Sequence, residues 1–172
     1  MDILAEIQAE QSKKQAEKIA KWIGADAERF APLMQLFLHG ELKLIPRVAV
    51  VLGTVTETHR ELIMPYLPEM ISRAMQPGMP DGIKRTVVRE LQFIDIPEPL
   101  HGDVMNMCFD LLADPQQAVA VRAFSMTVLS NLAQIYPEIK QEIIVILEDA
   151  LEQANTPGFI NRALKTMKAL TK

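Results

Sequence analysis

The chain has 172 residues, of which 49% are hydrophobic and 23% are charged, and its formal net charge is -4. This length suffices for one domain with a real core, and the composition excludes the low hydrophobicity and high charge of a disordered chain. The one cysteine, Cys108, excludes a disulfide within the chain, and the net negative charge argues weakly against a general nucleic-acid-binding protein.

The first 25 residues predict one amphipathic helix. Ile3, Ile7, Ile19 and Ile23 recur at helical spacing, and Gly24 ends the segment. The segment lacks the basic start and long apolar run of a signal peptide, which indicates a cytoplasmic protein. The longest unbroken apolar runs in the chain span five residues, far below the roughly 18 that a membrane-spanning helix needs. We therefore expect no membrane partner.

Four similar segments follow, each centred on an arginine: Arg47, Arg85, Arg122 and Arg162 are separated by 38, 37 and 40 residues. In each segment apolar residues recur at helical spacing around the arginine. The spacing predicts four equivalent second helices over residues 43–57, 82–95, 115–135 and 157–172.

Another apolar-periodic segment precedes each arginine helix, and proline and glycine separate the two. These segments predict first helices over residues 26–39, 59–76, 97–113 and 137–154. Because Pro65 and Pro68 fall inside the second of them, we expect a kink or a restart near Met64. Each repeat is thus predicted to be a helical hairpin, with repeats at about 26–57, 58–95, 96–135 and 136–172.

The start of the third arginine helix carries a marked turn. Asp114 is a suitable N-cap, Pro115 suits the first helical position, and Gln117 stands where a capping-box partner would. Together with Val121 and Arg122, this stretch resembles the HEAT and armadillo class of α-solenoids. The resemblance covers about residues 26–172.

The resemblance implies an all-α fold: a right-handed α-α superhelix, or HEAT-like solenoid, of four helical hairpins. Residues 1–25 would be an N-terminal capping helix that covers the end of the core, and residues 1–172 would form a single domain. The resemblance also implies that the arginine-bearing second helices line a concave inner surface.

Two interpretations of the repeated arginine remain open. In the first, each arginine donates hydrogen bonds to carboxylates or carbonyl ends of a neighbouring repeat and fixes the stacking. In the second, the arginines and their neighbours bind an anionic partner. The candidate partner-binding residues of the inner face are Lys43, Arg47, Arg85, Arg89, Arg122, Arg162 and Lys165.

The distribution of charge supports the second interpretation. The four second helices contain ten basic and three acidic residues. The four first helices, with the third counted through Asp114, contain four basic and thirteen acidic ones. Such a layer of positive charge attracts anionic partners. The alternative is that the basic layer only complements the acidic layer.

Catalytic and metal-binding constellations are not apparent. His101 and Cys108 are seven residues apart on one helix face, a separation of ~10 Å that is too long for proton transfer. No zinc-ligand spacing, glycine-rich phosphate loop or hydrolase motif occurs. We expect no enzyme, no cofactor and no metal.

The sequence therefore predicts a non-catalytic protein-interaction module or scaffold whose basic concave face binds an acidic protein or peptide. The alternative is a nucleic-acid-binding protein similar to the HEAT-like alkylpurine DNA glycosylases. Against this alternative, the one tryptophan, Trp22, lies on the predicted N-terminal helix. The identity of the partner and the oligomeric state stay open.

Overall fold

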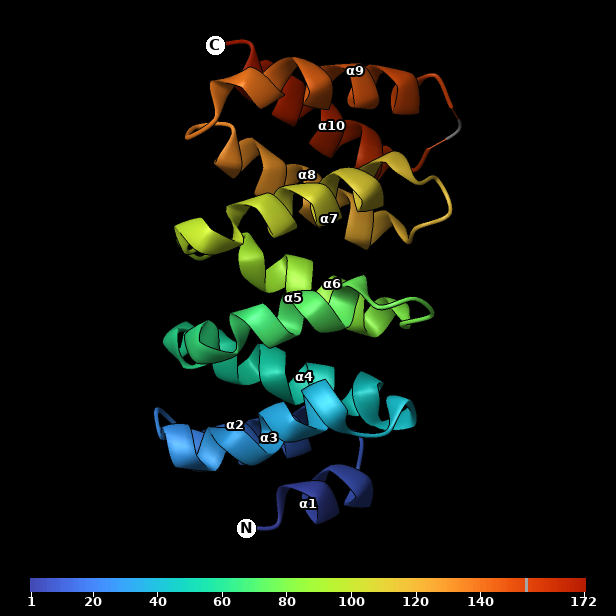
Figure 1. Cartoon of the computed structure of the whole chain (residues 1–172). Helices are drawn as coiled ribbons and strands as arrows, with labels where there is room; N and C mark the ends of the chain where they lie inside the picture. The colour runs from blue at the N-terminus through green and yellow to red at the C-terminus, as the bar shows by residue number, and fades with distance from the viewer. Residues whose placement is uncertain (154) are drawn as a thin grey trace. The chain divides into compact units, whose positions relative to one another are not determined.

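The computed structural model describes residues 1–153 and 155–172, and within them it contains ten α-helices and no strand. Figure 1 shows these helices following one another through short turns. The contacts divide the chain into two compact units, Met1–Glu90 and Leu91–Lys172. Each unit is described by itself below.

The first unit is built from six helices and two 3₁₀ segments. The α-helices are α1 (Ile3–Ala9), α2 (Lys13–Ile23), α3 (Ala27–His39), α4 (Ile45–Thr56), α5 (Leu67–Met75) and α6 (Asp81–Leu91), the last residue of α6 belonging to the second unit. The 3₁₀ segments are Leu42–Leu44 before α4 and Arg60–Tyr66 before α5. Helix α4 is central, because both α2 and α3 pack against it.

The prediction of a single helix over residues 1–25 was wrong. The chain breaks after α1, and Ser12 caps α2 by accepting a hydrogen bond of 3.0 Å from the Gln15 backbone N–H. The Gln15 side chain then donates to the Glu6 carbonyl at 2.7 Å, which holds the two helices together. The N-terminal segment is therefore a short hairpin, α1–α2, and the structure has ten helices where nine were expected. A serine followed by helix-forming residues was the signal for this second start.

The predicted restart within residues 59–76 is confirmed. A 3₁₀ segment runs through Pro65, and α5 begins at Leu67 with Pro68 in its first turn. Proline is tolerated at this position because the first N–H groups of a helix have no partner within it.

The core of this unit is formed by large side chains that are fully buried, among them Phe30, Phe37, Leu52 and Ile63.

The second unit contains two helical hairpins. Its helices are α7 (His101–Ala113), α8 (Val119–Leu132), α9 (Lys140–Leu151) and α10 (Pro157–Leu170), with 3₁₀ segments at Glu98–Leu100 and Pro137–Ile139. Helix α8 packs against both α7 and α10, and α10 packs against α9. The predicted end of the helix over 137–154, at Ala154, lies outside the described residues.

Asp114 does not have the predicted role of N-cap. Helix α8 begins at Val119, and Asp114 instead ends α7 and accepts hydrogen bonds from the Gln116 backbone N–H at 2.9 Å and the Gln117 side chain at 3.0 Å. The Asp114 carboxylate therefore stabilises the turn formed by the residues that follow it. This short-range bonding competes with helix formation and delays the start of α8.

The all-α architecture of helical hairpins is confirmed. The right-handed sense of the superhelix and the single domain over residues 1–172 stay predictions. Within the described part of the chain, no helix combines the length and apolar character needed to cross a bilayer.

The cap of α3 gives a test of these helix boundaries. Asp26 accepts hydrogen bonds from the backbone N–H groups of Glu28 at 2.9 Å and Arg29 at 3.1 Å. We expect Asp26→Ala to lower the free energy of unfolding by about 1 kcal/mol, because both donors lose their acceptor. Asp26→Asn keeps the acceptor and should lose less than half as much. Urea unfolding measures both variants, and an equal loss in the two would contradict a capping role.

Candidate functional site

The seven candidate partner-binding residues are divided between the two units. Those of the first unit are Lys43, Arg47, Arg85 and Arg89, and those of the second are Arg122, Arg162 and Lys165. Their surroundings differ widely, from fully exposed to buried. Which of them a partner can reach is therefore decided one residue at a time.

Arg47 holds the C-terminal end of α1. Its Nη1 atom donates to the carbonyls of Ile7 at 3.1 Å and Gln8 at 2.9 Å. The last carbonyls of a helix have no partner within it and carry partial negative charge, so a guanidinium stabilises them. This contact links α4 to the preceding hairpin, as the stacking interpretation predicts. The guanidinium is only half-buried.

Arg89 lies against the backbone of α4. A Cβ atom placed on Gly53 would stand 2.6 Å from Arg89 Nη1, so the glycine leaves the space that the guanidinium occupies. Gly53 is itself buried. Arg89 is thus part of the contact between α4 and α6, and charge reversal there would disturb packing as well as surface charge.

Beside Arg89 lies a buried carboxylate, Glu90, which is only 2% exposed. The Thr56 hydroxyl donates to Glu90 Oε1 at 2.8 Å, and Arg60 Nε lies 3.7 Å from Oε2, which accepts no hydrogen bond. Burial raises the pKa of Glu90 above its usual 4.5, and the Thr56 hydrogen bond and the charges of Arg89 and Arg60 only partly oppose this. Desolvation of the carboxylate is therefore the dominant effect.

Lys43 and Arg85 are exposed residues of the first unit. Lys43 forms an ion pair of 2.9 Å with Glu41, an acidic residue two positions earlier. Arg85 makes no hydrogen bond or ion pair with any described residue. Of the four candidate partner-binding residues in this unit, Arg85 is the one that is exposed without such a contact.

Arg122 is the most buried of the seven residues, at 5% exposure. Its Nε donates to the carbonyl of Leu112, near the end of α7, at 3.0 Å, and its guanidinium lies 4.6 Å from the centre of the Phe159 ring in α10. The hydrogen bond thus stays within its own hairpin, whereas the stacking interpretation placed it in the neighbouring one. The contact with the next hairpin is a cation–π contact.

The cations of α10 differ from one another. Arg162 is half-buried and donates from Nη1 to the Thr127 hydroxyl of α8 at 2.7 Å, a contact between consecutive hairpins. Lys165 and Lys168 are exposed. Helix α10 contains no acidic residue, so these two lysines give its surface a positive charge.

His101 and Cys108 both have structural surroundings. The His101 ring nitrogens lie 2.9 Å from the Tyr136 hydroxyl and 2.7 Å from the Ile96 carbonyl. Burial raises the pKa of the Cys108 thiol to about 12, so it carries almost no thiolate near neutral pH. Neither group is placed to act as a nucleophile or base.

A family model described as a HEAT repeat domain matches residues 3–170. The chain belongs to the HEAT repeat family. No curated protein and no solved structure matches it. The family match includes α1 and α2, in agreement with the finding that the N-terminal segment is a hairpin and not a lone helix.

Within this HEAT repeat chain three of the four repeated arginines contact a neighbouring hairpin, but only Arg47 does so through the helix-end carbonyls that the stacking interpretation names. Arg47 and Arg162 donate to a neighbouring hairpin, Arg122 stacks on one, and Arg85 is exposed. The buried carboxylate of Glu90 was not predicted from the sequence. Its position seven residues after Ile83, on the same apolar face, was the available signal. Partner binding by the exposed cations stays a prediction.

The role of Arg122 is tested by Arg122→Met, which keeps much of the aliphatic stem. The Leu112 carbonyl would lose its donor and Phe159 its cation, so we expect a loss of roughly 1 to 3 kcal/mol in the free energy of unfolding. Arg85→Met is the matched control and should change it by less than about 0.5 kcal/mol. Urea unfolding compares the two, and equal effects would mean that Arg122 is not a packing residue.

The Glu90 carboxylate should make stability depend on pH. Since its pKa is raised in the folded state, the stabilising contribution is complete below about pH 4.5 and is lost as pH rises through the folded pKa. Glu90→Gln cannot ionise and keeps an acceptor for Thr56. We therefore expect its unfolding free energy to rise relative to the parent between pH 4 and pH 8.

Urea unfolding at one-unit pH intervals measures this difference. Glu57→Gln, at an exposed residue following α4, controls for the loss of one negative charge. A Glu90→Gln difference that is constant with pH would contradict the dominant desolvation of Glu90.

Proposed function

We propose that this HEAT repeat chain is a non-catalytic interaction module that binds an acidic protein or peptide through exposed cations of its second helices. The observation that supports this most is the state of Arg85 and Lys165, which are exposed and make no ion pair with a described residue. Cations in this state attract anionic groups without first losing an internal contact.

The second unit carries two exposed lysines of its own on α10. Lys165 and Lys168 lie about one turn apart on α10, and Asn161 precedes them on the same helix with its side chain exposed. Lysines separated by three residues face the same side of a helix. An acidic segment lying along α10 would meet both ammonium groups.

Two of the seven predicted partner-binding residues, Arg89 and Arg122, are excluded from the proposed contacts. Arg122 is buried and Arg89 occupies the space above Gly53, so neither is offered as a contact residue. Arg47 and Arg162 are half-buried, and their side chains are retained as partial contacts. The proposed contacts are Lys43, Arg47, Arg85, Arg162, Lys165 and Lys168.

The test reverses three exposed charges: Arg85, Lys165 and Lys168 are changed to Glu in one variant. The probes are a fluorescein-labelled 16-residue peptide rich in Glu and Leu, and single- and double-stranded DNA of 20 nucleotides. We expect the parent to bind the peptide at low salt and the variant to bind it at least about tenfold more weakly, because attraction becomes repulsion.

The control variant reverses Lys13, Lys14 and Lys21, three exposed lysines of α2 outside the proposed surface. It carries the same change in net charge and should bind the peptide nearly as well as the parent. If both variants lost peptide affinity equally, the loss would be due to net charge, and the proposed contact residues would be wrong. DNA binding with a steep salt dependence, and no peptide binding, would overturn the proposal in favour of a nucleic-acid partner.

A further inference from the structure

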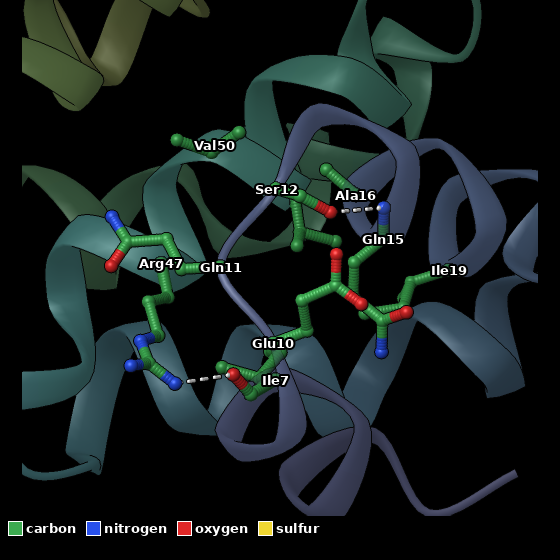
Figure 2. A pocket seen from close by; sticks show the side chains of 10 residues that line it. Ile7, Glu10, Gln11, Ser12, Gln15, Ala16, Ile19, Arg47 and Val50 are labelled. Carbon is green, nitrogen blue, oxygen red and sulfur yellow. Dashed lines mark hydrogen bonds between the residues drawn. The ribbon is translucent and has the colours of Figure 1, made fainter.

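A small cavity of about 110 Å³ lies in the first unit between α4 and the turn that joins α1 to α2. Figure 2 shows the side chains of Glu10 and Ser12 on one side of it, and Arg47 with the Gln11 side chain beside it on another. Its apolar wall is formed by Ile7, Ala16, Ile19, Val50 and Val51. The cavity exists because the N-terminal segment turns back at Ser12 and does not continue as one helix.

Val50 makes the cavity reachable from solvent. It is 49% exposed, whereas Ile7 and Ile19 at the inner wall are 1% and 0% exposed. Gln11, another lining residue, is also exposed. An apolar wall with an open edge suits an aliphatic side chain from outside, and a cavity of about 150 Å³ is known to hold a ring of six carbons. The size here suits three or four carbons.

Arg47 supplies the polar part of the site. Its Nη1 atom is used by the Ile7 and Gln8 carbonyls. A guanidinium has five N–H donors, so Nε and Nη2 keep three that have no partner among the described residues. These two nitrogens form the edge that binds a carboxylate in a bidentate manner.

We propose that this cavity is an anchor pocket for an aliphatic side chain, such as that of leucine, which lies next to a carboxylate in an acidic peptide. The isobutyl group enters between Val50 and Ile19, and the carboxylate meets Nε and Nη2 of Arg47. The inference rests on the proposed function, since it identifies part of the acidic partner. It also adds an apolar requirement, which the exposed lysines do not impose.

Glu10 restricts the orientation of a ligand in the pocket. It lines the cavity from the α1–α2 turn, and Figure 2 shows its carboxylate on the side of Ser12 and Gln15, away from the Arg47 guanidinium. A carboxylate of the ligand is repelled from that side and attracted to the other. The apolar group and the charge of the ligand therefore take one orientation.

The small-molecule probe is 4-methylpentanoate, which carries an isobutyl group and a carboxylate. Titration into the full chain, followed by methyl NMR, should shift the signals of Val50, Val51 and Ile19 with a dissociation constant on the order of 1 mM. The neutral amide 4-methylpentanamide should bind at least about fivefold more weakly, since it lacks the charge for Arg47. Equal binding of the two, or shifts elsewhere only, would overturn the assignment.

The variant is Val50→Asn, which removes apolar wall without adding charge. Val145→Asn is the matched control, because Val145 is 52% exposed on α9 in the other unit. We expect Val50→Asn to weaken binding of 4-methylpentanoate at least about fivefold and Val145→Asn to leave it unchanged. Circular dichroism is used to verify that both variants are folded. Equal affinity of the two variants for 4-methylpentanoate would contradict the proposed pocket.

A peptide pair separates this inference from the proposed function. Two 16-residue peptides have the same number of Glu residues, and one carries Leu beside Glu where the other carries Ser. If both peptides bind equally well to the parent, the proposal of an acidic partner is kept and the proposal of the anchor pocket is contradicted. If neither peptide binds, both fail. The expected result is at least about fivefold tighter binding of the Leu peptide, lost in Val50→Asn.

Discussion

A helix of this chain cannot bury its own apolar side chains, and the remaining features depend on that constraint. The helices are between 7 and 14 residues long, a length at which an isolated helix is marginal in water. Each gains its stability by packing on a neighbour, as α4 does between α2 and α3. The residues at those contacts are therefore decided by packing first, and only side chains outside them are available to a partner.

The repeated arginine shows how one sequence position serves different contacts. Arg47 donates to helix-end carbonyls, Arg122 to a carbonyl of its own hairpin and the face of Phe159, and Arg162 to a threonine hydroxyl. A long side chain with five donors can find a partner wherever the local spacing between helices places one. The repeated position therefore does not impose a single geometry, and at Arg85 the side chain is exposed.

The hairpin architecture could be predicted from the sequence because apolar periodicity reports directly on which helix face is buried. The break at Ser12 and the late start of α8 could not, since both depend on short hydrogen bonds that compete with helix formation. The set of cations was predictable, but their availability was not. Whether a guanidinium is exposed, as at Arg85, or buried, as at Arg122, depends on the neighbouring hairpin.

The isolated thiol of Cys108 has a consequence for the dynamics of the second unit. It is fully buried, and its pKa of about 12 leaves it unreactive in the closed structure. Modification by a thiol reagent therefore requires α7 to separate from its neighbours, at least transiently. Since the chain has one cysteine, the modification rate reports how often Cys108 is exposed, by local opening of this hairpin or by global unfolding, and a ligand that rigidifies the hairpin would slow the local route. Cys108 is thus a built-in probe of unfolding in the second unit.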